Sequence, residues 1–289
     1  MRVLITGAGG QVGRALAKCA PSSMELYLAE RTDLDICDEV SVRARIRDLV
    51  PDVIINAAAY TAVDRAESEP EFARRVNADG PRFLAQAAAD QGARLLHLST
   101  DFVFDGRSSS PYLPESPTNP LNVYGLTKRE GEEAVLDALG ARALVLRTSW
   151  VYAPAGKNFV RTMLRLMSEH RSVRVVADQV GTPTAAHSIA RILWLLVDRP
   201  DISGVHHWTD AGVASWYDFA VAIAEDAVSA GLLAPDVSVT PIRTRDYPVA
   251  ARRPPYSVLD TTSLVEALGV VPVHWRHNLR KVIGDIKSA

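Results

Sequence analysis

Short apolar runs alternate with amphipathic stretches along roughly the first 200 residues of the chain. The apolar runs predict strands at residues 3–6, 25–29, 53–57, 95–99, 143–147 and 173–177. The amphipathic stretches predict helices at residues 12–20, 40–49, 71–91, 123–139 and 159–169. Several of the strands are continuously apolar, as in a parallel sheet that is covered on both faces. The repeating βα order therefore predicts the α/β class, with a Rossmann-like, doubly wound parallel sheet and right-handed crossovers.

The alternation of predicted strands and helices becomes less regular after about residue 202. A helical pattern at 215–229 is followed by a proline-rich stretch, and short helical patterns at 262–268 and 275–287 end the sequence. We expect these residues to form a smaller C-terminal α+β lobe that holds the substrate. The predicted division is a dinucleotide-binding domain at residues 1–152, with a returning segment at about 171–207, and the lobe at residues 208–289.

Composition narrows the class of protein. The 289 residues are 47% hydrophobic and 23% charged, as in an ordinary globular protein, and the net charge of -2 leaves no basic excess for binding nucleic acid. Cys19 and Cys37 are too few for a disulfide framework and lack metal-site spacing, which fits a reducing compartment. The first predicted strand begins at residue 3, so we expect no signal sequence before it. The longest apolar run within a helical pattern, 192–197, is far shorter than the ~18 residues that span a membrane. We therefore expect a cytoplasmic protein without a membrane partner.

A glycine motif follows the first predicted strand. Gly7, Gly10 and Gly13 have the spacing G-x-x-G-x-x-G and lead into a helical pattern. Such glycines permit a tight turn, close approach of the backbone to a pyrophosphate, and close packing of the helix on the sheet. The helix N-terminus then offers free N–H groups to the phosphates. We expect a dinucleotide site here; the alternative is a glycine-rich turn without a ligand.

The second predicted strand ends at Glu30 and Arg31. A carboxylate at this place binds the ribose diol of NAD, whereas an arginine favours the 2′-phosphate of NADP. Because both residues are present, the sequence predicts either NADPH or NADH as the cofactor, and an exposed charge pair without a ligand stays an alternative. Asp35 and Ile36 follow in a short segment where the adenine ring could lie.

Tyr124 and Lys128 are four residues apart and share one face of the predicted helix at 123–139. An ordinary tyrosine has a pKa near ~10, and a neighbouring ammonium group lowers the pKa of the phenol toward working pH. The same lysine can hold the nicotinamide ribose. Ser99 or Thr100, at the end of a predicted strand, could hydrogen-bond a substrate carbonyl. The alternatives are a chance Tyr–Lys pair on an exposed helix face and hydroxyls that only cap a strand end.

Longer motifs identify a family. The segments NAAAYTAVD (56–64), STDFVFDG (99–106), NPLNVYG (119–125), RTSWVY (147–152) and DQVGTPT (178–184), with Arg253-Pro254, Ser257 and Leu259, occur in this order. Together with the glycine motif and the Tyr–Lys pair, they resemble the dTDP-4-dehydrorhamnose reductase family of the extended short-chain dehydrogenase/reductase superfamily. The resemblance spans nearly the whole chain. Two departures are Phe102, where the family often has tyrosine, and Tyr60, where histidine is commoner.

The resemblance implies roles for individual residues. Tyr124 is expected to be the proton donor, Lys128 its partner, and Thr100 the group that orients the carbonyl. Expected cofactor contacts further include Gln11, Val12, Ala59, Tyr60 and Thr61. Expected substrate contacts further include Asp101, Trp150, which would pack against the sugar, and Arg253, which would bind the diphosphate through its planar fork. No carboxylate cluster has the spacing of a metal site, so no metal ligand is assigned.

The implied activity is NAD(P)H-dependent reduction of the C4 ketone of dTDP-4-dehydro-6-deoxy-L-mannose to dTDP-L-rhamnose, by a monomer or homodimer. One alternative is a sibling reductase of another dTDP-4-keto-deoxysugar, for example in a dihydrostreptose-type pathway. Another is a non-catalytic, NADP-binding regulatory subunit, against which the intact Thr100, Tyr124 and Lys128 set argues. An epimerase or dehydratase is less well supported, because Asp101 alone follows Thr100 where a dehydratase has a carboxylate pair.

Overall fold

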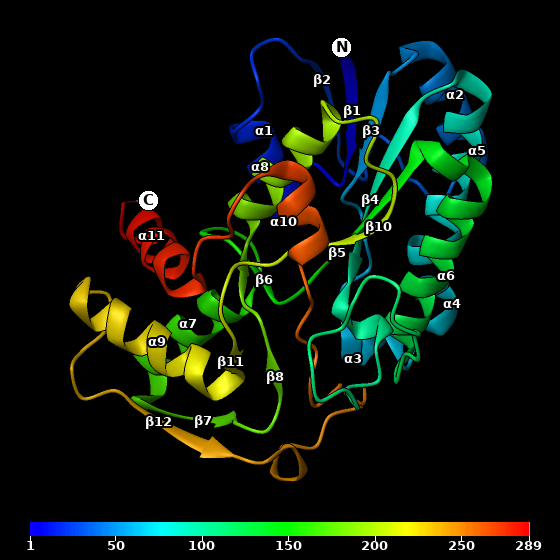
Figure 1. Cartoon of the computed structure of the whole chain (residues 1–289). Helices are drawn as coiled ribbons and strands as arrows, with labels where there is room; N and C mark the ends of the chain where they lie inside the picture. The colour runs from blue at the N-terminus through cyan, green and yellow to red at the C-terminus, as the bar shows by residue number, and fades with distance from the viewer. Residues whose placement is uncertain (289) are drawn as a thin grey trace.

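The central sheet of the computed structural model, which describes residues 1–288, has six parallel strands in the order β10-β5-β4-β3-β1-β2 (Figure 1). The strands are β1 Arg2–Thr6, β2 Glu25–Ala29, β3 Val53–Asn56, β4 Arg94–Thr100, β5 Ala143–Thr148 and β10 Gly204–His207. The first five predicted strands are confirmed to within two residues at each end. The doubly wound α/β class is confirmed with them.

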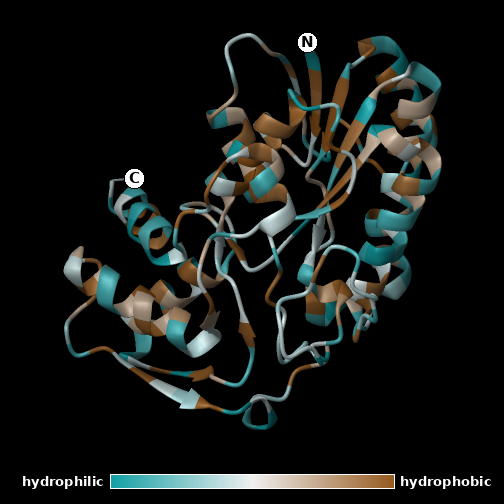
Figure 2. Ribbon diagram, viewed as in Figure 1, coloured by the Kyte–Doolittle hydropathy of each residue, from teal (hydrophilic) through white to brown (hydrophobic). Residues whose placement is uncertain are grey.

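Helices cover both faces of this sheet. One face is covered by α2 Glu39–Leu49, α5 Gly80–Gln91 and α6 Val123–Leu139, and the other by α1 Gln11–Lys18, α8 Ala186–Val197 and α10 Thr262–Leu268. Figure 2 shows the strands and the inner sides of the helices as mostly hydrophobic. Burying one apolar stripe of each helix on a sheet that is apolar on both faces is the main stabilising interaction of this layer arrangement.

The helix predicted at 71–91 is interrupted. It consists of α4 Pro70–Arg74, a π-helical turn Arg75–Asp79 and α5. The wide turn brings Asn77 against α6, where its Nδ2 donates to the Thr127 hydroxyl at 3.2 Å. Asn77 also exchanges two hydrogen bonds with the backbone of Tyr60, at 2.8 and 3.0 Å. A π-turn often marks a functional region, and here it fixes the loop after β3 against α6.

The sixth strand of the sheet is not the predicted one. Residues 173–177 fall mainly in β7 Ser172–Val176, which pairs in parallel with β12 Ser238–Ile242 in a separate two-stranded sheet. The main sheet ends instead with β10, a four-residue strand with two histidines that lacks an apolar run. β7 is buried along one side only, which suits a small sheet under helices rather than a covered central strand.

The smaller lobe packs around α7 Phe159–His170, α9 Trp216–Ser229 and α11 Trp275–Lys287. It lies below the main sheet in the view of Figure 1. Because α7 and β7 belong to its core and α10 packs on the main sheet, the predicted boundary at residue 208 does not follow the packing.

The remaining elements are short. They are the helix α3 Val63–Ala66 and 3-10 turns at Asp101–Val103, Gly140–Arg142 and Thr244–Asp246. Two further strand pairs are β6 Val151–Tyr152 with β9 Thr184–Ala185, and β8 Val180–Gly181 with β11 Ala214–Ser215.

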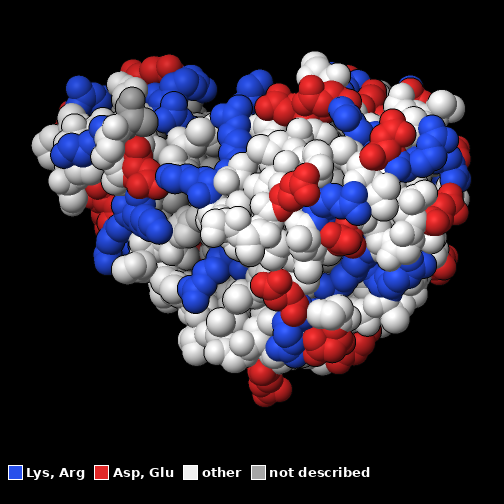
Figure 3. Space-filling view, turned by 90° about the horizontal axis from the view of Figure 1, so that it is seen from above, with Lys and Arg blue, Asp and Glu red and all other residues white. Residues whose placement is uncertain are grey.

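Charges of both signs are mixed on the surface shown in Figure 3. This agrees with the near balance of 32 basic and 34 acidic residues. Within residues 1–288, no helix is long and apolar enough to cross a membrane.

Candidate active site

A cleft of about 410 Å³ lies beside the carboxyl ends of β1, β2 and β3. In an open parallel sheet, ligands bind at this edge of the strands. The cleft brings together many of the residues predicted to bind a cofactor: Gly7, Gly10, Glu30, Arg31, Asp35, Ile36, Ala59 and Tyr60. It is also lined by Gly9, Arg14, Leu34, Cys37, Ala57, Ala58, Phe72 and Val76.

The glycine turn is too crowded for side chains. Gly7 has φ +70°, and a Cβ there would lie 2.6 Å from the backbone nitrogen of Ala58. A Cβ on Gly13 would overlap the carbonyl oxygen of Gly7, so this glycine lets α1 pack directly on the turn. The turn therefore presents bare backbone and the N-terminus of α1 to the cleft, which is the geometry that binds a pyrophosphate.

The other residues predicted to contact the cofactor lie outside the lining of this cleft. Val12 and Gly13 are buried under the turn, and Thr61 is exposed on the loop after β3. The Gln11 side chain accepts a hydrogen bond at 2.9 Å from Asn158, at the start of α7. Their contacts with a cofactor stay predictions.

Glu30 and Arg31 both reach the cleft. A Cβ on Gly9 would lie 2.9 Å from the Glu30 carboxylate, so this carboxylate lies over the glycine turn. Arg31 lies over the Phe72 ring, 5.4 Å from its centroid, with a guanidinium nitrogen 3.9 Å from Asp35. Its side chain is 71% exposed and can move toward a ligand. Both residues therefore line the cleft at the end of β2. Their contacts with a ribose or a 2′-phosphate stay predictions.

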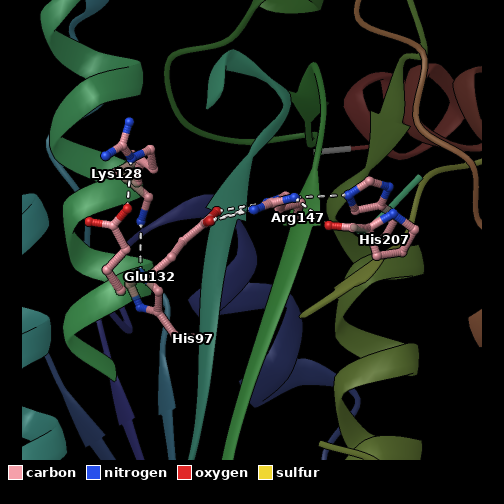
Figure 4. A network of polar contacts seen from close by, with 8 residues as sticks. His97, Lys128, Glu132, Arg147 and His207 are labelled. Carbon is pink, nitrogen blue, oxygen red and sulfur yellow. Dashed lines mark hydrogen bonds and ion pairs between the residues drawn. The ribbon is translucent and has the colours of Figure 1, made fainter. Parts of the chain in front are cut away.

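The Lys128 side chain extends from α6 toward β4, near the carboxyl end of that strand (Figure 4). Its Nζ donates to the carbonyl oxygen of Leu98 at 2.7 Å and lies 3.3 Å from Nε2 of His97. Burial lowers the pKa of Lys128 to about 8, and the negative charge of Glu132 partly opposes that shift. Lys128 is therefore a buried, pKa-shifted amine at the carboxyl end of β4, as expected of a group that acts in proton transfer.

Sequence reasoning missed the polar residues behind Lys128. Nδ2 of Asn56 lies 3.0 Å from Nδ1 of His97, and Oδ1 of Asn56 accepts from the Thr6 hydroxyl at 2.7 Å. Because the backbone N–H of Ala58 also donates to Oδ1 of Asn56, the amide orientation is fixed and Nδ2 faces the imidazole. The signal in the sequence was a histidine inside an apolar strand, which is costly to bury without partners.

Tyr124 lies one helical turn before Lys128, with its ring edge-on to Phe102 at 5.6 Å between centroids. Burial raises the pKa of Tyr124 to about 12, the Asp101 charge adds to the shift, and the Thr100 hydroxyl opposes it. This corrects the expectation that a neighbouring ammonium lowers the pKa of the phenol. The reason is that Nζ of Lys128 bonds to Leu98 and His97. The phenol therefore carries its proton at neutral pH, as an ordinary tyrosine also does.

Thr100 and Asp101 are buried at the end of β4. The Thr100 hydroxyl accepts from the backbone N–H of Phe102 at 3.2 Å, so it does cap the strand end, and it bonds to Oδ1 of Asp101 at 3.1 Å. Burial raises the pKa of Asp101 to about 7, against the opposing effects of Ser257 and Thr100. The Thr100 hydroxyl therefore lies beside Tyr124. Its contact with a substrate carbonyl stays a prediction.

A buried ion pair fixes α6 to the sheet (Figure 4). Glu132, on α6, accepts from the guanidinium of Arg147, on β5, in three contacts of 2.7 to 3.2 Å. Both side chains are at most 6% exposed. Arg147 also donates to the carbonyl of Pro114 at 3.0 Å and lies 3.5 Å from His207 on β10. These contacts hold the helix that carries Tyr124 at one position over the strands.

Trp150, predicted to pack against the sugar, and Arg253, predicted to bind the diphosphate, both contact other residues of the protein. The Trp150 ring stacks on Trp216 with 3.6 Å between centroids, and its backbone has φ 47°. Arg253 donates to both carboxylate oxygens of Asp64, at 3.0 and 2.7 Å, and ties the C-terminal segment to α3. Substrate contacts by Trp150 and Arg253 stay predictions. Over the part of the chain that the structure describes, no group of three or more His, Cys, Asp or Glu side chains could hold a metal ion.

Comparisons with known proteins agree with this architecture. A glycine turn after β1, with a Tyr–Lys pair beside the hydroxyl end of β4, is the arrangement of a short-chain dehydrogenase/reductase. Residues 1–288 match the family described as the RmlD substrate binding domain, and the chain belongs to this family. A curated relative, dTDP-4-dehydrorhamnose reductase of Aggregatibacter actinomycetemcomitans, is 42% identical over 288 residues, which are 97% of this chain and 98% of the relative.

Solved structures extend the similarity to three dimensions. A dTDP-4-dehydrorhamnose reductase from Clostridium acetobutylicum superimposes with TM-score 0.94 at 40% identity, over 99% of this chain and 100% of that one. One from Bacillus anthracis, in complex with NADP, gives TM-score 0.92 at 34% identity, over 98% and 99% of the two chains. With relatives of this kind matched over their full length, the chain is an oxidoreductase, and its function is that of a reductase.

Proposed function

We propose that the chain uses NADPH or NADH to reduce the C4 ketone of dTDP-4-dehydro-6-deoxy-L-mannose to dTDP-L-rhamnose. The observation that carries the proposal is the grouping of Thr100, Tyr124 and Lys128 at the sheet edge that also holds the glycine turn. The relatives described above are named for this reaction, and one of them was solved with NADP. A dinucleotide fits the cleft, because the turn offers backbone N–H groups and has glycine at positions 7 and 13, where a Cβ would clash with backbone.

Tyr124, Thr100 and Lys128 each have a separate role in the proposed reduction. Bound NAD(P)H supplies the hydride that adds to C4 of the sugar. Tyr124, which is half-buried, holds its proton and gives it to the oxygen at C4 as that oxygen gains negative charge. Thr100 donates a hydrogen bond to the same oxygen and stabilises the developing charge. Lys128, whose Nζ is held by the carbonyl of Leu98, supplies a donor for the cofactor ribose.

A second candidate is a sibling reductase that makes another deoxysugar from a dTDP-4-keto precursor. The observation that favours it is Phe102, whose ring lies against Tyr124 in a position where the family often has tyrosine. A missing hydroxyl beside the reacting centre removes one possible hydrogen bond to the sugar. The chemistry of Tyr124 is the same in both candidates, so the product alone separates them.

The proposal is tested by generating the substrate from dTDP-glucose with the upstream dehydratase and epimerase, then adding this protein with NADPH or NADH. We expect oxidation of the cofactor and a product whose sugar is identified as L-rhamnose by NMR. A different 4-hydroxy sugar would establish the sibling reductase. Binding of NADPH without turnover of any dTDP-4-keto sugar would overturn both candidates and favour a non-catalytic, NADP-binding subunit.

A further inference from the structure

The Thr100 hydroxyl has one proton and more than one acceptor for it. A hydroxyl group donates one hydrogen bond and accepts two. One acceptor position is used by the backbone N–H of Phe102, at 3.2 Å. The hydroxyl also bonds to Oδ1 of Asp101, at 3.1 Å. The phenol of Tyr124 lies within its hydrogen-bonding reach as well. If Asp101 is ionised, its carboxylate can only accept, so the single proton of Thr100 points at Asp101 and is not free for a substrate carbonyl.

Protonation of Asp101 reverses this contact. A neutral carboxyl group donates its O–H to the free lone pair of the Thr100 oxygen. The hydroxyl then accepts twice, from Phe102 and from Asp101, and its own proton is free to turn toward a third group. In this arrangement every donor and acceptor position of the Thr100 hydroxyl is used once a substrate carbonyl is bound.

The surroundings of Asp101 favour the neutral form. Asp101 is 1% exposed, and its Oδ2 is buried with no hydrogen-bond partner. Tyr124 faces it from α6, and Ser257 faces it from the C-terminal segment with a hydroxyl. The nearby cation on α6, Lys128, points its Nζ at Leu98 instead. An ionised carboxylate here is a poorly paired buried charge, which agrees with the raised pKa of Asp101, about 7.

We propose that Asp101 is a positioning residue that frees the Thr100 hydroxyl for the substrate ketone only when Asp101 carries a proton. The inference rests on the proposed function, because it takes Thr100 as the group that donates to the carbonyl. Productive binding of the ketone is then coupled to uptake of one proton from solvent by Asp101. That proton stays on Asp101 through the reduction, since Tyr124 supplies the proton that the product keeps.

The coupling gives the reaction a defined pH dependence. As the pH rises through the pKa of Asp101, the ionised carboxylate again accepts the hydrogen bond of the Thr100 hydroxyl. That hydroxyl is then not free for the substrate ketone, and kcat/KM falls. The fall approaches tenfold per pH unit above that pKa. Lys128 titrates in a similar range, so the shape of a single profile cannot assign the fall to Asp101. The assignment requires variants that remove one group at a time.

The test compares the ratio of kcat/KM at about pH 6 to that at about pH 8.5 in four proteins. They are wild type, Asp101→Asn, Thr100→Val and the double variant, with Asp137→Asn, an exposed acid on the same helix as Tyr124, as the control. An asparagine can donate to Thr100 at any pH, so Asp101→Asn should reduce the ratio at least threefold. In the Thr100→Val background the same substitution should leave the ratio unchanged, because Asp101 acts through Thr100. Asp137→Asn should keep the wild-type ratio.

Two kinetic results would overturn the proposal: a wild-type ratio in Asp101→Asn, or an equal effect of that substitution with and without the Thr100 hydroxyl.

A second measurement is independent of turnover. In protein labelled with ¹³C at aspartate carboxyls, we expect the Asp101 signal to titrate near neutral pH, and Thr100→Val to raise its pKa further by removing a donor to the carboxylate. A signal that titrates with the exposed aspartates, or no shift in Thr100→Val, would refute the coupling. If wild type oxidises no NAD(P)H with the sugar, the proposed function fails, and the NMR titration still decides the contact.

Discussion

The predicted cofactor side of the site is built from residues close together in the sequence, whereas the predicted substrate side joins distant segments. The glycine turn, the end of β2 and the loop after β3 all lie within the first 60 residues. On the other side, Trp150 stacks on Trp216, and Arg253 reaches Asp64 across 189 positions. The first side follows from the spacing of residues along the sequence, whereas the second depends on which distant segments the fold brings together. We therefore expect substitutions on the two sides to affect different properties of the protein.

The largest effect is expected at the ion pair that holds α6 over the strands, between the two sides. Arg147→Met removes the partner of Glu132 and leaves a buried carboxylate, so the free energy of unfolding should fall by ~3–5 kcal/mol. Arg147→Met combined with Glu132→Leu removes both charges and should recover most of that loss. Urea unfolding of the two variants measures the difference. Equal stability of the single and double variants would show that the pair does not fix α6.

The next largest effect is expected at the reacting centre that both sides share. Tyr124→Phe removes only the phenol proton, so kcat should fall by ~10² or more while NADPH still binds. Stopped assays for the product and fluorescence titration with NADPH measure the two effects separately. Near-normal turnover would exclude Tyr124 as the proton donor. Loss of NADPH binding would mean that the substitution disturbs the cofactor side as well.

The substrate side is tested at Arg253 and its partner. Arg253→Ala should raise the KM of the sugar nucleotide ~10-fold by removing a charge-assisted contact of ~1.5–3 kcal/mol, with NADPH binding unaffected. Asp64→Asn is the matched variant, because it releases Arg253 without deleting it. If Arg253 binds the diphosphate, Asp64→Asn should keep KM at or below the wild-type value. If both variants raise KM equally, Arg253 only ties the C-terminal segment to α3.

The smallest effect is expected on the predicted cofactor side, where we expect the backbone of the glycine turn to make most of the contacts. Glu30 repels a 2′-phosphate and Arg31 attracts it, so NADPH and NADH should both support turnover within roughly tenfold of each other. Arg31→Ala should lower the preference for NADPH over NADH by about threefold or more. Glu30→Gln should change the ratio in the opposite direction. An unchanged ratio in Arg31→Ala would exclude the assigned contact.

The sequence alone predicted half of the residues that line the cleft beside β1, β2 and β3. The continuous apolar runs placed the first five strands, and the glycine spacing placed the turn, because each depends on neighbouring residues. The Tyr124–Lys128 pair followed from helical periodicity in the same way. The confirmed parts of the fold are therefore those set by local chain geometry.

What the sequence did not predict depends on contacts between distant residues. β10 is short and polar, and it becomes a strand by pairing with β5. The bond of Lys128 to Leu98, which leaves its charge turned from Tyr124, needs the packed position of α6. The pairing of Arg253 with Asp64 likewise needs the whole chain, since local pattern gives no hint that an arginine beside prolines meets α3.

The central claim is that this site delivers hydride to C4 of the sugar and that Tyr124 completes the reduction. The most direct measurement uses NADPH carrying deuterium at both C4 positions of the nicotinamide, with the dTDP-4-keto sugar, and analyses the product by NMR. The account predicts a product with deuterium at C4 of the deoxyhexose, formed ~10²-fold more slowly by Tyr124→Phe. A product with hydrogen at C4, or deuterium at another carbon, would contradict it.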